Sequence, residues 1–267
     1  MGNNQASRPE KMALTRGRRL TLALGLPFAL ASIGYAGLNY VSLVAQAKYQ
    51  LRPVALPAGA AVQIDDGSGD LTVVPSPDRY AHLQGTVYYS LVHASVSRKS
   101  AAGHLMVQGP NCFWIGSCGA NLQFAAPAGA RLTVALGDGS LVATDVNGSL
   151  RLRDSSGGLT LRDVSGSLIL SDSSGDITAT GLGAATVTAS DSSGNVDLSF
   201  TRAPDYLAVH DASGDINIAV PGNIAYRVTV ETDFGSKNID VPTNPSSEHV
   251  IKLSANSGNV SVVPAAG

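Results

Sequence analysis

The feature that most constrains this chain is a nine-residue repeat. Glycines recur every nine residues at Gly139, Gly148, Gly157, Gly166 and Gly175. Each is followed by a short triplet, such as Leu150-Arg151-Leu152 or Leu159-Thr160-Leu161, in which the outer residues are apolar and the middle one is usually polar. Alternation with a period of two is typical of a β-strand with one buried face. Ile169 departs from the pattern, because it places an apolar residue at a middle position.

Corners separate these strands. Each corner has the form D-x-S-G, in which Asp can hydrogen-bond the backbone two residues on and Gly tolerates positive φ. We therefore interpret the repeated Asp and Gly residues as turn-forming. They are Asp154, Gly157, Asp163, Gly166, Asp172, Gly175, Asp191, Gly194, Asp211 and Gly214.

Strands this short cannot bury an inner face alone, but stacked copies can, which is the principle of a solenoid. The spacing of the later corners predicts a full coil of about 18–22 residues made of two halves, and about seven coils between residues 130 and 263. The predicted fold class is all-β: a single-stranded parallel β-helix or solenoid of short repeats with an irregular β cap, preceded by one N-terminal transmembrane helix. The alternative is an antiparallel sandwich, whose strands are usually longer.

The composition supports a turn-rich β protein, with 29 glycines, 5% aromatic and 14% charged residues. The net charge of −2 gives no basic footprint, so we expect no nucleic-acid partner.

The N-terminus predicts a membrane anchor. Basic residues, Arg18 and Arg19 among them, precede 28 uncharged residues that end before Lys48. Roughly 20 apolar residues suffice to cross a bilayer, and a basic flank stays in the cytoplasm. We therefore expect a single-pass bacterial membrane protein with its C-terminal part outside the cytoplasm. Cleavage at Ala45-Gln46-Ala47, which would secrete the protein, is the alternative; the apolar stretch is about twice a usual signal-peptide core.

These observations divide the chain into five segments. They are a basic cytoplasmic tail (1–19), the transmembrane anchor or signal (20–47), a linker (48–57), an irregular β cap (58–130) and the regular solenoid repeats (131–263).

The predicted cap contains both cysteines, Cys112 and Cys118. In an exported domain such a pair favours a disulfide over a metal site, because two thiolates are too few for a zinc shell; two reduced, packed cysteines are the alternative. The loop between them would present Phe113 and Trp114, which are candidate binding residues. The same aromatics would also suit a plug over the end of the solenoid core.

Charged residues of the repeats form a second candidate site, comprising Arg151, Arg153 and Arg162 near Asp154 and Asp163. A solvated patch of alternating charge is the simpler interpretation. We expect no metal, because D-x-S-G does not match the calcium nonapeptide G-G-x-G-x-D-x-U-x, although a calcium ladder on the corner carboxylates stays the alternative. The histidines are scattered, and G-x-S-x-G and H-E-x-x-H are absent from the sequence, so we expect no catalytic residues and no cofactor.

The repeats contain the unit S-G-D-[IL], as in Ser174-Gly175-Asp176-Ile177 and Ser213-Gly214-Asp215-Ile216, and a Cys-x5-Cys pair precedes a Pro-x-Gly strand. On these motifs residues 58–263 resemble the bacterial putative-adhesin family of β-helical domains of unknown function. The resemblance implies the solenoid fold and brings no catalytic residues with it.

We therefore predict an extracytoplasmic, membrane-tethered surface interaction or scaffold module without catalysis. Its expected partner is a polysaccharide or a surface protein bound through weak multivalent contacts. A carbohydrate-active enzyme, either a lyase or a hydrolase, is the first alternative, and a purely structural spacer is the second. The sequence does not indicate an oligomeric state.

Overall fold

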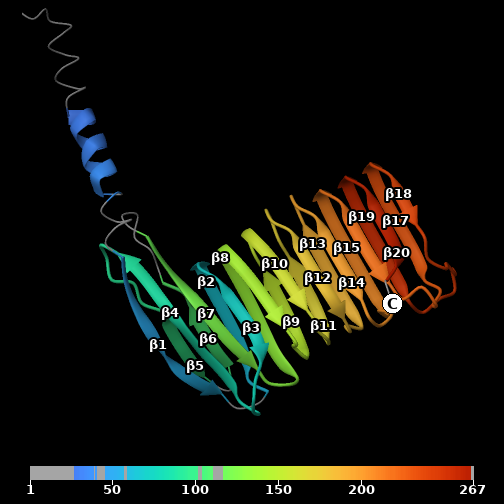
Figure 1. Ribbon diagram of the computed structural model, residues 1–267, viewed down its shortest axis with the longest axis horizontal. Coiled ribbons are helices and arrows are strands. Elements are labelled where there is room, and N and C mark those ends of the chain that lie inside the picture. The colour runs from blue at the N-terminus through green and yellow to red at the C-terminus, as the bar shows by residue number, and fades with distance from the viewer. Residues whose placement is uncertain are drawn as a thin grey trace, which may run out of the picture.

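The computed structural model describes residues 27–38, 40, 46–56, 59–101, 104–110 and 117–265, and it is shown in Figure 1. Residues 27–38 are helical, and twenty strands follow. The first ten are β1 (Gln46–Leu56), β2 (Ala61–Ser68), β3 (Leu71–Pro75), β4 (Ala81–Ser90), β5 (Ser97–Ala101), β6 (His104–Gln108), β7 (Cys118–Ala126), β8 (Ala130–Thr144), β9 (Gly148–Arg153) and β10 (Ser156–Arg162). The others are β11 (Ser167–Ser171), β12 (Ile177–Leu182), β13 (Thr186–Asp191), β14 (Val196–Phe200), β15 (Tyr206–Ser213), β16 (Ile216–Val220), β17 (Arg227–Phe234), β18 (Lys237–Ile239), β19 (Val250–Ser257) and β20 (Val260–Pro264).

The strands form two parallel ladders. Ladder A runs in the order β7, β3, β8, β10, β12, β14, β16, β20, β18. Ladder B runs in the order β6, β2, β8, β9, β11, β13, β15, β19, β17. The long strand β8 bends, so that its first half pairs in ladder B and its second half in ladder A. Each pair of strands is one coil, and seven of these nine layers lie from β8 onward, as predicted.

The register confirms the repeat length. Leu141 aligns with Leu159, Leu159 with Ile177, Ile177 with Val196, and Val196 with Ile216, so successive coils contain 18 to 20 residues. The outer residues of the triplets are buried, as Leu150 and Leu152 show at 2% and 0% exposure. The middle residues face outward. The predicted parallel stacking of apolar pairs around one core is therefore confirmed.

Chain order and spatial order differ at both ends of the stack. The last coil, β19 and β20, lies between β15–β16 and the outermost coil, β17–β18 (Figure 1). At the other end β2–β3 lies between β8 and the later coil β6–β7. At each end, therefore, the two outermost layers are stacked in the reverse of their order along the chain.

The region predicted as an irregular cap is only partly a cap. Its strands β2–β3 and β6–β7 are full layers of the solenoid, in register with β8. The antiparallel strands β1, β4 and β5 cover this end, with β4 on β7, β1 on β4, and β5 on β6. They end the parallel ladders where open edges would otherwise invite pairing with other chains.

The expected linker at residues 48–57 needs correction, because β1 occupies residues 46–56. Leu51 and Leu56 are buried at 7% exposure each, and Tyr49 packs against the core. This alternation was hard to recognise in the sequence because it is interrupted by Lys48, Arg52 and Pro53.

The predicted anchor, residues 20–47, is described only in part, since residues 20–26, 39 and 41–45 lie outside the described residues. Gln46 and Ala47, its last two residues, belong to β1. Within the described ranges, no helix has the length and apolar character that a membrane crossing requires. The anchor therefore stays a prediction.

Candidate binding face

The outer surface of ladder B contains a hollow of about 680 Å³ over five adjacent strands, β6, β2, β8, β9 and β11. We call it the ladder-B hollow. Its lining includes His104, Met106, Arg131, Thr133, Arg151 and Ile169. All six occupy outward-facing positions of their strands, which alternation turns away from the core.

The register explains why the surface is hollow. Met106, Gln63, Thr133, Arg151 and Ile169 form one row across the strands. The neighbouring row consists of His104, Ala61, Arg131, Ser149 and Ser167. The small side chains of Ala61, Ser149 and Ser167 leave gaps beside His104 and Arg131. Because the hollow extends over five adjacent strands, it forms a trough that runs along the stack, across the strands.

The hollow is basic. Arg131 and Arg151 line it, Lys99 lies opposite Met106 on β5, and Arg153 follows on β9. The ion pairs found among the described residues involve His82 with Asp78 and His249 with Asp205, so none of these four cations is neutralised by a described carboxylate. The Arg131 Nη2 donates to the Gly59 carbonyl oxygen at 3.2 Å. These guanidinium and ammonium groups are therefore available to an external anion.

The structure divides the arginine cluster expected from the sequence. Arg151 lines the hollow, and Arg153 lies two residues further along the same outward face of β9. Arg162, at the end of β10, belongs to ladder A. Grouping the three as one site was therefore wrong, because consecutive nine-residue units alternate between the two ladders.

Sequence reasoning missed His104, Met106 and Arg131 as site residues. They come from the segment treated as a cap and from the first long strand, and only the register of β2 with β6 and β8 brings them beside Arg151. One sequence signal was available: Ile169, an apolar residue at an outward position, is 37% exposed in the hollow.

The corner aspartates form a buried column on the inside of the coils. Asp154, Asp172, Asp191 and Asp211 are at most 3% exposed. Their Oδ1 atoms accept hydrogen bonds from the next one or two backbone N–H groups, at 2.6 to 3.3 Å. These hydrogen bonds are the contacts that the predicted turn-forming role requires.

The second oxygen of each of these carboxyls is buried and has no hydrogen-bond partner within the part of the chain that the structure describes. Burial raises the pKa of all four carboxyl groups. Asp66 occupies the same column, and burial raises its pKa to about 6. Asp163 differs, since it lies exposed at the opposite corner with a φ of 52°. No three His, Cys, Asp or Glu side chains in the described ranges come together to hold a metal ion.

The reason why glycine is needed at the corners differs from the one expected from the sequence. Of the five predicted, Gly166 alone has positive φ, at 112°. At Gly157, Gly175, Gly194 and Gly214 a Cβ would overlap the carbonyl oxygen of the corner glycine in the layer before. These glycines are therefore required because successive corners stack backbone against backbone.

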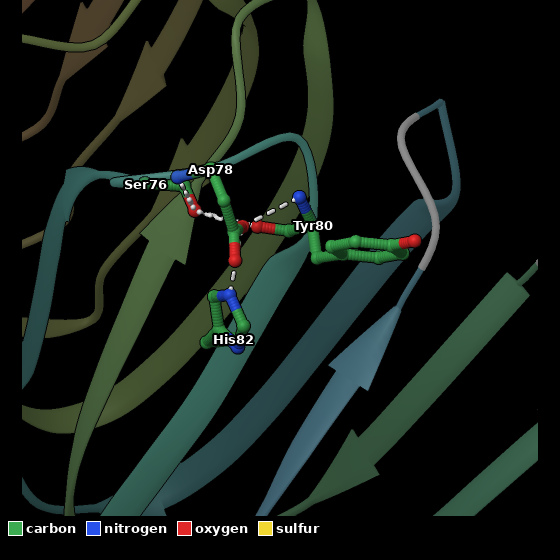
Figure 2. A network of polar contacts seen from close by, with 4 residues as sticks. All are labelled: Ser76, Asp78, Tyr80 and His82. Atoms are coloured by element: carbon green, nitrogen blue, oxygen red, sulfur yellow. Dashed lines mark hydrogen bonds and ion pairs between the residues drawn. The ribbon is translucent and has the colours of Figure 1, made fainter.

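A further polar cluster lies in the loop between β3 and β4 (Figure 2). Asp78 accepts hydrogen bonds from the Tyr80 backbone N–H at 2.7 Å and from the Ser76 hydroxyl at 3.1 Å, and it contacts His82 Nε2 at 2.9 Å. The hydrogen bond from His82 lowers the pKa of Asp78. Both Ser76 and His82 bind the carboxylate, so the histidine does not link serine to aspartate as a catalytic triad requires. The cluster stabilises an exposed turn.

The cysteine loop is only partly visible. Cys118 begins β7 and is not a free thiol. Cys112, Phe113 and Trp114 lie outside the described residues, so the disulfide and the aromatic contact site stay predictions.

Several solved structures have a similar arrangement. A putative adhesin from Bacteroides fragilis is 15% identical, with 81% of this chain and 98% of that chain covered and a TM-score of 0.45. A putative adhesin from Parabacteroides merdae is 12% identical, with 82% and 96% covered and a TM-score of 0.45. A putative lipid binding protein from Parabacteroides distasonis is 14% identical, with 82% and 97% covered and a TM-score of 0.42. No curated protein matches the chain.

The family comparison is more direct. Residues 53–263, which include both ladders and the last four residues of β1, match one protein family. This match confirms the resemblance inferred from the S-G-D units. The chain belongs to the Toastrack DUF4097 family.

Proposed function

We propose that this protein is a membrane-tethered, extracytoplasmic interaction module that binds its partner through the ladder-B hollow and performs no catalysis. The observation that carries the proposal is a pair of arginines, Arg131 and Arg151, in a hollow on a continuously hydrogen-bonded surface, with no carboxylate paired to either within the described part of the chain. A rigid, pre-formed site loses little conformational entropy when it binds.

The placement of the titratable groups supports binding over catalysis. An acid–base enzyme needs a carboxyl group with a shifted pKa within reach of its substrate. The carboxyls with raised pKa, Asp66 among them, face the interior and are buried. The hollow offers arginine, serine, threonine and apolar side chains, which are suited to holding a ligand.

The tethering part of the proposal is supported by the basic flank and the 28 uncharged residues that follow it. Adding protease to intact cells that express the full chain tests the orientation. Digestion of the solenoid without lysis is the expected result, and protection until lysis would place the domain inside the cell.

The binding part is tested with cells displaying the full chain on an array of glycans and surface proteins. The double variant Arg131→Gln/Arg151→Gln should lose captured ligands. Arg162→Gln, an equally exposed arginine on ladder A, is the matched control and should behave as the parent chain. A parent chain that captures no ligand would favour the structural spacer over an interaction module.

A further inference from the structure

We propose that the ladder-B hollow binds an acidic polysaccharide that lies along the axis of the stack, across the strands. This inference rests on the proposed function and specifies its ligand. Three features of the hollow support this inference: the local charge, the direction of the trough and the apolar side chains at its two ends.

The charge of the hollow opposes that of the domain around it. Five of the 18 Lys and Arg residues and one of the 20 Asp and Glu residues precede residue 46, so the rest of the chain has 13 basic and 19 acidic residues. Yet Lys99, Arg131, Arg151 and Arg153 gather on one half of one face. Among the described outward residues of β2, β5, β6, β8, β9 and β11, the carboxylates are Asp65 and, where β8 bends, Asp138. A basic patch on an acidic domain attracts a polyanion while the rest of the surface repels it.

The two arginines of the hollow lie in adjacent rows of its lining. Arg131 belongs to the row of Ala61 and Ser149, whereas Arg151 belongs to the row of Thr133 on the next strand. One strand spacing and two residues separate them, so their Cα atoms are roughly 8 Å apart. A polymer bound along the trough would therefore meet guanidinium groups from two adjacent rows, and guanidinium forms two parallel hydrogen bonds with a carboxylate or phosphate.

The trough favours a linear ligand. Its five strands are separated by four spacings of about 4.8 Å, so the trough is roughly 19 Å long from β6 to β11, which is several sugar rings in length. The concave surface argues against a planar bilayer as the ligand, since a flat sheet of headgroups would touch the rim before the floor. A flexible polymer can follow the depression.

The apolar residues at the two ends of the trough distinguish sugar from phosphate polymers. Met106, on β6, is 40% exposed and Ile169, on β11, is 37% exposed. Binding sites combine apolar walls with a few placed polar groups. The C–H face of a uronic-acid ring supplies apolar surface as well as a carboxylate, whereas polyphosphate supplies charge alone.

The inference is tested by measuring binding of the purified full chain, in detergent micelles, to immobilised polygalacturonate. We expect saturable binding that weakens as salt is added and falls at least tenfold in Arg131→Gln/Arg151→Gln. Arg162→Gln/Arg202→Gln removes the same charge from exposed positions elsewhere and should leave the affinity within twofold. Ile169→Glu should also lower it at least tenfold, which a purely electrostatic contact with an unrelated face would not show. Equal melting temperatures would establish that all variants are folded.

Three further probes separate the possible outcomes. Neutral dextran bound equally well through the same arginines would overturn the acidic ligand and leave the proposed function intact. Preference for polyphosphate or for phosphatidylglycerol vesicles over polygalacturonate would overturn the polysaccharide. Equal losses in both double variants would show that the hollow is not the site, and both proposals would then fail.

Discussion

At the scale of single residues, the corners show how one motif serves two purposes. The aspartate closes its own turn through Oδ1, and the glycine lets the next corner approach. The cost is a column of carboxyl groups with one oxygen left without a hydrogen bond among the described residues. Burying an unpaired charge is unfavourable, and this burial raises the pKa of the carboxyl groups.

Stability should therefore depend on pH through this column. Asp66 has a folded-state pKa of about 6 against a usual 3.8, so the folded state binds its proton more tightly than the unfolded state does. The stabilisation is fully present below about pH 4 and is lost as the pH rises through 6, up to about 3 kcal/mol. Asp66→Asn should melt at a higher temperature than the parent at pH 7.5 and at a similar one at pH 4. Exposed Asp163→Asn is the control, and superimposable pH profiles for all three chains would contradict the assignment.

The stacking of the corner glycines predicts a strong contrast in stability between substitutions at Gly175 and at Gly158. Gly175→Ala places a Cβ on the carbonyl oxygen of Gly157, whereas at Gly158 the nearest atom is the Asp176 oxygen at 3.4 Å. We expect Gly175→Ala to lower the free energy of unfolding by about 3–5 kcal/mol and Gly158→Ala by less than about 1. Urea titration of both variants measures the difference; comparable losses would mean that the stacking of the corners is not the constraint.

At the scale of elements, the inserted coil determines which strands are interior. β19 pairs with β15 on one side and β17 on the other, although it lies near the C-terminus. Leu253 on β19 is 2% exposed, and its partner Val230 on the outermost strand is only partly buried. Position in the chain is therefore a poor guide to position in the stack.

This arrangement predicts where truncated side chains matter most. Leu253→Ala should cost about 2–4 kcal/mol, because layers on both sides hold the side chain and a cavity would remain. Val230→Ala, at the matching position of the outermost layer, should cost about 1 kcal/mol or less, since one side is open. Denaturant unfolding compares them, and a Leu253→Ala cost as small as that of Val230→Ala would mean that the last coil is not interior.

Local patterns predicted the repeat, the coil length and the buried triplets, because these depend on alternation and corner chemistry within nine residues. Neither the insertion of β19–β20 nor the pairing of β2 with β8 was predictable in this way. Both depend on which of several distant strands packs better against the core. The sequence of a short segment contains no information about that choice. The same limit applies to the binding face: Arg151 was identified, but Arg131 and Met106 reach it only through long-range register.

At the scale of the whole molecule, the solenoid is modular between its ends. Each coil from β9 to β16 pairs with one layer before it and one after it. Stability in such arrays is a sum of layer and interface contributions. The ends, where strand order and chain order differ, are the parts that cannot be exchanged freely.

Deleting one complete coil should therefore be tolerated. Removing residues 163–180 joins Arg162 to Gly181, and because Arg162 aligns with Thr180 the register of both ladders is kept. The shortened chain should fold, with a urea m-value lower by roughly a tenth, since m follows the surface exposed on unfolding. Circular dichroism and urea unfolding measure both quantities.

A deletion of half a coil is the matched control. Removing residues 163–171 sends the next strand to the wrong ladder and breaks the column of corner aspartates. We expect that chain not to unfold cooperatively. If it proved as stable as the chain that lacks a full coil, the two ladders would be interchangeable and the alternation of corners would have no structural meaning.

The insertion of β19–β20 also determines how the molecule can come apart. In a solenoid whose coils stack in chain order, the terminal coil can detach first, and each coil that detaches exposes the next. Here β19–β20 lies between two neighbouring coils. Unfolding must therefore begin with the outermost coil, β17–β18, which is covalently connected to the rest of the chain at both of its ends. Detaching β20 would accordingly require its hydrogen bonds to β16 and to β18 to break together, so the solenoid resists unwinding through this strand.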